Sequence, residues 1–257
     1  MRFHPPRSLG IVAALLLLLA PSAGASAHDL WITTIADGDA VRAVVNFGHP
    51  AEREAPDLHR LLDLVLISPG GATSLREGTL GEQRIDGAPV LVSQRFAVPA
   101  AGAVLAGRYD NGYWVKTPHG YRKASKRLFP GAEDSLWAVK FAKTLLGPGA
   151  YATVVGHELE LVPLDDPFRL AAGAPLRIRV LFRGTALANA AVELGDGVSP
   201  IADKDIPRFR SGSDGVAALP IDRRGPFVLA VDYRAAGKDP ALAASDYYNA
   251  TLAFRLR

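Results

Sequence analysis

Short runs of hydrophobic or alternating hydrophobic and polar residues fill most of the chain after residue 27, and glycine or proline separates them. Such runs are typical of β-strands, because alternate side chains of a strand point to opposite faces of a sheet. The pattern therefore predicts an all-β protein. The strands expected in the first half are His28–Ile35, Ala40–Gly48, Leu61–Ser68, Pro89–Val98, Gly102–Tyr109 and Asn111–Thr117.

One segment, residues 135–146, has a different pattern. Its apolar residues Ala138, Phe141 and Leu145 recur at intervals of three and four, which is helical spacing. Asp134 or Ser135 can cap the start of a helix, and the glycine and proline at 147–148 can end it. The sequence therefore predicts one short helix over residues 135–146.

The segment after residue 158 contains regularly spaced short strands between turns rich in Gly, Asp and Pro. This spacing is typical of an immunoglobulin-like or transthyretin-like sandwich. We therefore expect two β-sandwich-like domains, residues 28–157 and residues 158–257. The strands expected in the second domain are Leu159–Val162, Leu176–Phe182, Ala191–Leu194, Val216–Pro220, Phe227–Tyr233 and Asn249–Leu256.

Residues 1–27 have the organisation of a secretory signal peptide. Arg2 and Arg7 precede an apolar stretch over residues 11–20, and Ala25-Ser26-Ala27 forms a small-residue cleavage pattern. The apolar stretch is shorter than the roughly 20 residues of a membrane-spanning helix, and no later stretch is close to that length. We expect cleavage after Ala27, a periplasmic location and no membrane insertion of the mature chain.

Charge and cysteine content narrow the classes of partner and reaction. Removing the two arginines of residues 1–27 lowers the formal net charge from +3 to +1, a balance that does not indicate a nucleic-acid partner. The chain has no cysteine, so packing rather than disulfide bonds must stabilise it. The sequence also lacks a G-x-S-x-G motif and a glycine-rich phosphate loop, so we expect no catalytic residues.

Cleavage after Ala27 would make His28 the first residue. An α-amino group titrates near pH 8 and an imidazole near 6.5, so this residue would offer two nitrogen donors to a metal near neutral pH. A two-residue turn at Asp37-Gly38 would place His28 opposite Phe47, with His49 as its diagonal neighbour on the same face. A register slip of one residue would separate the histidines. Alternatively, His28 is simply a residue that the peptidase tolerates.

The expected metal ligands are His28, His49, His119 and His157. His119 lies in a turn and His157 precedes the expected second domain, where an exposed or structural role is the alternative. Glu52 is a further candidate. It is a metal ligand, a hydrogen-bond acceptor that orients an imidazole, or a solvated residue without a role in the site. These residues form no local metal-binding motif, so folding must bring any site together.

Several motifs in a fixed order resemble a known family. Over essentially the whole mature chain they are similar to the periplasmic family of unknown function DUF4198, whose members are often labelled as nickel-uptake components. The motifs are His28-Asp29-Leu30-Trp31, Phe47-Gly48-His49-Pro50-x-Glu52, Trp114–Gly120, Gly156–Leu164, Val180–Gly184 and Ser213-Asp214-Gly215.

The resemblance implies an amino-terminal β domain that begins with histidine, followed by a transthyretin-like sandwich. It implies transition-metal uptake across the envelope beside a nickel or cobalt transporter, with His28 as the terminal histidine and His49 and Glu52 in the His-Pro-x-Glu element. Ala51 departs from the phenylalanine that nickel-associated members often carry, and the start of the mature chain has fewer histidines than theirs. The identity of the metal therefore stays open.

Three functions follow as hypotheses. The first is a binding protein that captures Ni²⁺ or Co²⁺, or alternatively Cu²⁺, and passes it to a membrane transporter. Amine and imidazole donors suit all three ions and intrinsic affinity favours copper, so nickel rests on the resemblance alone. The second is a copper redox enzyme that holds its metal through the terminal histidine. The third is an adhesive or scaffold protein in which the histidines are incidental.

Overall fold

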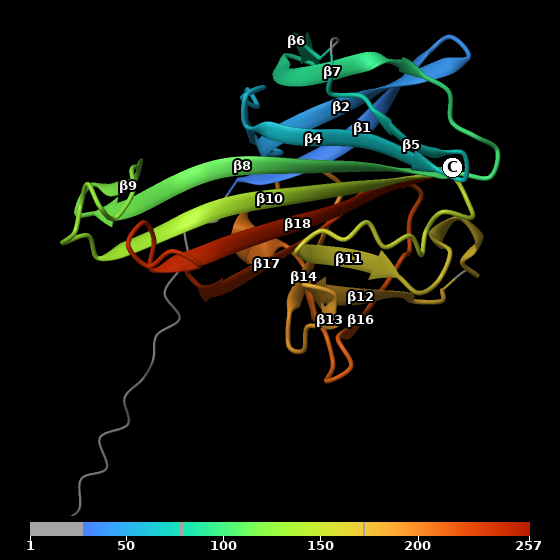
Figure 1. Ribbon diagram of the computed structural model, residues 1–257. Coiled ribbons are helices and arrows are strands. Elements are labelled where there is room, and N and C mark those ends of the chain that lie inside the picture. Colours follow the sequence, from blue (N-terminus) through green and yellow to red (C-terminus); the bar gives the residue numbers. More distant parts are fainter. Residues whose placement is uncertain (1–27, 78–79, 172) are drawn as a thin grey trace, which may run out of the picture.

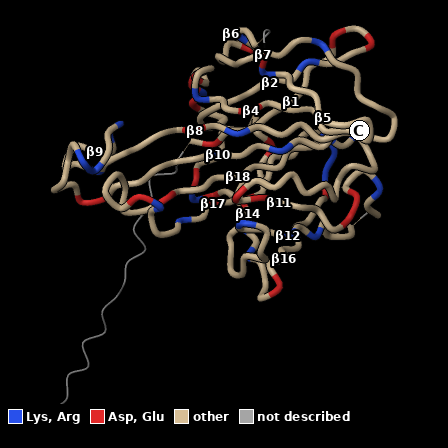
Figure 2. Tube along the Cα trace, viewed as in Figure 1, with Lys and Arg blue, Asp and Glu red and all other residues tan. Residues whose placement is uncertain are grey.

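The computed structural model describes residues 28–77, 80–171 and 173–257, and it consists almost entirely of strands (Figure 1). The expected signal peptide lies outside the described residues. The all-β prediction is confirmed, since the helical segments described are two 3₁₀ turns, Pro167–Arg169 and Asp203–Asp205. Among the described residues, no helix has the length and apolar character needed to span a bilayer. Basic and acidic residues are interspersed in the view of Figure 2.

The described strands form three sheets. The N-terminal sheet has the order β1-β2-β7-β6, with β3 paired to β2, and contains β1 (Asp29–Asp37), β2 (Ala40–His49), β3 (Glu52–Glu54), β6 (Gly81–Ile85) and β7 (Ala88–Phe96). The C-terminal sheet has the order β11-β12-β13, with β16 paired to β12, and contains β11 (Leu159–Pro163), β12 (Leu176–Phe182), β13 (Thr185–Ala186) and β16 (Val216–Leu219).

The central sheet has the order β15-β14-β17-β18-β10-β8-β4-β5, with β9 paired to β8. Its strands are β4 (Leu61–Ser68), β5 (Gly71–Ser74), β8 (Ala103–Thr117), β9 (Gly120–Lys123), β10 (Asp134–Leu146), β14 (Ala191–Gly195), β15 (Arg208–Arg210), β17 (Gly225–Ala236) and β18 (Ser245–Leu256).

The strands of the central sheet lie between those of the N-terminal and C-terminal sheets (Figure 1). On β10, Ala142 and Leu146 pack into the core shared with the N-terminal sheet, whereas Phe141 and Leu145 pack into the core shared with the C-terminal sheet. The expected domain boundary at residues 157/158 falls between β10 and β11. Strands from both sides of that boundary share the central sheet, because β10 pairs in parallel with β18.

The predicted helix over residues 135–146 is wrong, because this segment is strand β10. It pairs with β8 on one side and with β18 on the other, and residues 138–146 are all buried. A strand covered on both faces is apolar throughout and shows no alternation, so its few polar residues can mimic helical spacing.

The hairpin of β1 and β2 turns at Gly38 and Asp39, one residue later than predicted. Gly38 has a φ of +66°, as the first central residue of a type II′ turn requires. Trp31 therefore pairs with Asn46. This register differs from the predicted one by two residues, which leaves every side chain on its expected face.

The outer edge of β1 is bound by side chains of the central sheet rather than by another strand. These hydrogen bonds satisfy backbone carbonyls that a buried edge would otherwise leave without donors. They fix the start of the N-terminal sheet across β10 and β18. The bonds run from Lys140 Nζ to the His28 carbonyl, from Thr251 Oγ1 to the Leu30 carbonyl (2.6 Å) and from Thr144 Oγ1 to the Ile32 carbonyl (2.8 Å).

Candidate metal site

His28 and His49 are in direct contact. Continuing the β1–β2 register past Asp29 and Gly48 places the two histidines opposite each other, and their ring centroids are 5.2 Å apart. A metal–nitrogen distance of about 2.0–2.1 Å puts two imidazole centroids roughly 4–6 Å apart around one ion. The separation of these rings lies in that range. The prediction that folding brings His28 and His49 together on one face agrees with this geometry.

The immediate surroundings favour a neutral His28 imidazole. Its ring packs edge-on against Phe47, and Nδ1 lies 3.5 Å from a carboxylate oxygen of Glu54. Burial lowers the pKa of His28, and the Glu54 carboxylate opposes this shift. A neutral imidazole has a free lone pair, so near neutral pH this ring can bind a metal without first losing a proton.

Beneath the pair, a buried polar network holds the first residues of β1. Lys140 is fully buried, burial lowers its pKa, and its Nζ donates to the His28 carbonyl. The side-chain nitrogen of Asn249 donates to both Asp29 and Asp232, at 2.8 Å each. Burial, together with the Asp232 carboxylate, raises the pKa of Asp29 to about 7. The network fixes the backbone position from which His28 projects.

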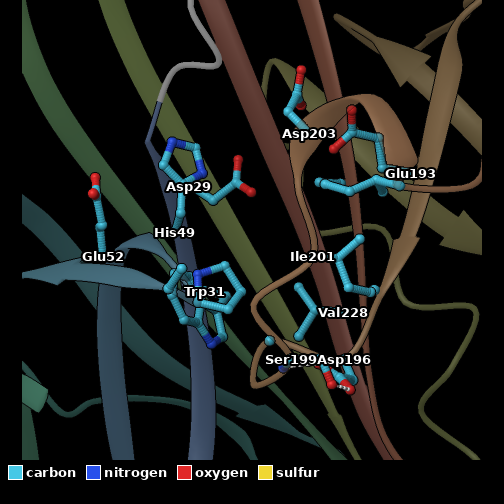
Figure 3. Close-up of a pocket in the computed structure, with 16 residues that line it drawn as sticks. Asp29, Trp31, His49, Glu52, Glu193, Asp196, Ser199, Ile201, Asp203 and Val228 are labelled. Atoms are coloured by element: carbon cyan, nitrogen blue, oxygen red, sulfur yellow. Dashed lines mark hydrogen bonds between the residues drawn. The ribbon is translucent and has the colours of Figure 1, made fainter.

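A cavity of about 280 Å³ opens beside His49 (Figure 3). One wall comes from β1 and the β2–β3 turn, and the other from β14, β17 and the segment 195–206. The first wall carries Asp29, Trp31, His49 and Glu52, and the second carries Glu193, Asp196, Ser199, Ile201, Asp203 and Val228.

The structure places His119 outside this site. Tyr109 pairs with Lys140, which binds His28, whereas His119 lies beyond Thr117 in the exposed turn between β8 and β9. Eight strand residues at 3.3 Å each separate Tyr109 from Thr117 by up to about 26 Å. The pairing of β8 with β10 is irregular between Asp110 and Gly112, and beyond it the strand continues to the exposed turn that carries His119.

His157 also lies outside the site, on the opposite face of the central sheet. Its ring stacks on Phe141 with centroids 4.8 Å apart, whereas the neighbouring Lys140 points to the His28 side of β10. Burial lowers the pKa of His157 to about 4, with Glu160 opposing the shift. The structure therefore does not bring His157 to the His28–His49 pair, and its stacking on Phe141 agrees with the structural alternative.

Glu52 is the remaining candidate, and it is exposed at the start of β3, at the mouth of the cavity. His59 is exposed and does not line the cavity. Over residues 28–77, 80–171 and 173–257, no group of three or more His, Cys, Asp or Glu side chains is arranged to hold a metal. The third donor near His28 and His49 would be the α-amino group, which exists only when the chain begins at His28.

Sequence reasoning missed Lys140 and Asn249. Both are charged or polar residues inside otherwise apolar strands, and both have no exposed surface. That placement is the signal that could have found them, because a buried lysine or asparagine requires a specific partner. The partner itself could not be identified, since β1 is more than a hundred residues away in sequence.

A model of the family described as "Domain of unknown function (DUF4198)" matches residues 25–235. A search of curated proteins gives no match. Native alpha-2-macroglobulin from Escherichia coli aligns over 87% of this chain and 71% of its own, with 11% identity and a TM-score of 0.24. A chimeric titin functionalised with a decorin peptide aligns over 89% of this chain and 94% of its own, with 13% identity and a TM-score of 0.18.

Proposed function

This chain belongs to the DUF4198 family of unknown function, and we propose that it binds a divalent transition-metal ion through His28 and His49 after cleavage at Ala27. The observation that supports the proposal is the contact between the two imidazole rings, 5.2 Å between centroids. With the new α-amino group, His28 supplies two nitrogen donors and His49 supplies the third. The buried network at Lys140 holds the backbone of His28 in place.

The ion is Ni²⁺ or Co²⁺, with Cu²⁺ as the alternative. In this proposal the protein binds the ion in the periplasm and passes it to a membrane transporter. Three nitrogen donors suit all three ions, and the intrinsic affinity of such a site rises from cobalt to nickel to copper. The half-buried position of the rings also favours this role. A site at the surface of β1 and the β2–β3 turn stays accessible to the receiving protein.

Calorimetric titration of the mature protein with Ni²⁺, Co²⁺ and Cu²⁺ tests the proposal. We expect one ion per chain with a Kd below about 10 µM, equivalent to more than about 7 kcal/mol of binding free energy. His49→Ala removes one donor, and we expect at least a tenfold loss of affinity. His59→Ala removes an exposed imidazole outside the site and serves as the matched control.

A second variant isolates the α-amino group. Adding one alanine before His28 turns that amine into an amide, which can bind a metal only after losing its proton, while both imidazoles stay in place. We expect a loss similar to that of His49→Ala. The intact mass of the exported protein shows whether cleavage follows Ala27. Equal binding by all variants, or no binding of any of the three ions, would leave the histidines incidental and favour the scaffold hypothesis.

A further inference from the structure

The cavity and the histidine pair share one residue. His49 contacts His28 on one side and lines the cavity of about 280 Å³ on the other. Its volume is at the lower end of the range for small-molecule pockets, so it fits a ligand of roughly amino-acid size. A ligand bound to an ion at His49 would extend directly into this space (Figure 3).

The interior of the cavity combines an apolar surface with hydrogen-bonding groups. Val228 and Ile201 face it from the second wall, and Trp31 lies on the first. Arg53 covers the Trp31 ring, with the guanidinium carbon 5.5 Å from the ring centroid, and donates to the Gly197 carbonyl at 2.9 Å. Arg53 therefore occupies one face of the Trp31 ring, and the cavity beside the ring is open to an organic ligand.

The charge of the lining is negative at the His49 end. On the far wall, Arg208 pairs with both Glu193 and Asp203, at 2.6 Å and 2.9 Å. At the near wall, Asp29 is half-buried and accepts a hydrogen bond from Asn249, whereas the exposed Glu52 forms no ion pair with a lysine or arginine in the described residues. An unpaired carboxylate such as that of Glu52 repels anions at this range and attracts cations. A carboxylate-rich chelator is therefore disfavoured.

We propose that the cavity holds a small nitrogen chelator, neutral or cationic, of the imidazole or amine class, which binds the metal ion together with His28 and His49. This inference rests on the proposed function and specifies the form in which the ion is bound. Three protein nitrogens leave coordination positions free on a six-coordinate ion. His49 forms the wall of the cavity, so those positions can be filled from inside it.

Titration of the nickel-loaded mature protein with histamine, which carries both an imidazole and an amine, tests the inference. Citrate at the same concentration is the anionic comparison. The expected result is histamine binding at least tenfold tighter with Ni²⁺ than without it, and a ternary complex of chain, ion and histamine in the native mass spectrum. Citrate is expected to remove nickel from the protein without forming such a complex.

Two tryptophan substitutions on one loop connect the binding to the cavity. Ile201 lines it and is 44% exposed, whereas Val198 is 59% exposed and does not line it. Ile201→Trp fills the space and is expected to weaken histamine binding at least tenfold while leaving Ni²⁺ binding unchanged. Val198→Trp is the matched control and is expected to have no effect on either.

The outcomes separate the two proposals. Nickel binding without a histamine complex, or histamine binding that Ile201→Trp leaves unchanged, overturns the inference and leaves the proposed function standing. A citrate complex as stable as the histamine complex also overturns it, because the charge argument then fails. Absence of Ni²⁺ binding in the titration without histamine overturns both.

Discussion

The buried ion pair between Lys143 and Glu160 provides a quantitative test of how the two halves of the chain are joined. Both side chains are 2% exposed, and Nζ lies 2.8 Å from Oε1. Glu160 also accepts hydrogen bonds from the backbone of Val155 at 2.8 Å and of Gly156 at 3.0 Å. One carboxylate therefore holds β10, β11 and the segment between them.

Glu160→Leu would leave the buried ammonium group of Lys143 without its counter-ion, with the Thr153 carbonyl as its remaining acceptor, and two backbone N–H groups without an acceptor. Breaking a buried ion pair by removing one partner costs about 3–5 kcal/mol, and each unsatisfied donor adds about 1–3 kcal/mol. We expect the free energy of unfolding to fall by at least about 4 kcal/mol. Lys143→Met combined with Glu160→Leu removes the isolated charge, so the double variant should be more stable than Glu160→Leu alone.

Urea unfolding, followed by tryptophan fluorescence and circular dichroism, measures both variants. The exposed pair of Lys116 and Glu133, 3.3 Å apart, is the matched control, and Glu133→Gln is expected to change stability little. If Glu160→Leu lowered stability by less than about 1 kcal/mol, solvent would reach this pair and the arrangement described would be wrong. A double variant less stable than the single one would refute the argument from an isolated charge.

Three further predictions concern pH, the turn and the edge of β1. The pKa of His157 is about 4 in the folded chain and near 6.5 when unfolded, so stability should fall by about 3 kcal/mol as pH drops from 6.5 to 4, and His157→Phe should flatten the pH dependence of urea midpoints. Gly48 has a φ of +107°, and a Cβ there would lie 2.4 Å from the Glu52 carbonyl. Gly48→Ala should therefore lower the free energy of unfolding, measured by thermal unfolding, by about 1–3 kcal/mol, and it should weaken nickel binding by displacing His49. An unchanged nickel affinity would show that the conformation of this turn does not determine the position of the site. Thr251→Val removes a buried hydrogen bond to β1 and should lower the free energy of unfolding, measured by chemical denaturation, by about 1–3 kcal/mol. An unchanged denaturation midpoint would contradict this expectation.

Much of the fold could be predicted because its strands are separated by glycine and proline and several have one polar face. The hairpin from His28 to His49 was predicted with the correct faces, although a Gly-Asp turn replaced the expected Asp-Gly turn. The error at residues 135–146 has a physical reason. A strand buried on both faces has the composition of a buried helix, and only its pairing with β8 and β18 distinguishes the two.

The candidate site was partly predictable for a similar reason. His28 and His49 are close because of a local hairpin, whose register follows from the sequence pattern to within two residues. Lys140 and Asn249 reach β1 through tertiary packing between sheets, which no local pattern encodes. The positions of His119 and His157 depend on the length and direction of β8 and β10. The presence of a histidine in the sequence therefore did not indicate whether it joins the site.

The bonds at the outer edge of β1 connect the first and last parts of the folded chain. Thr251 and Leu30 are 221 residues apart in sequence, and Asn249 binds Asp29 from the same terminal strand. Contacts of such long range carry a large loop-closure entropy and slow folding, and this one requires the last strand of the chain. The histidines are therefore present early in the chain, but they acquire a rigid platform only when β18 docks. Truncated products would carry the same donors without that platform, so under the proposed function metal binding would discriminate finished molecules from incomplete ones.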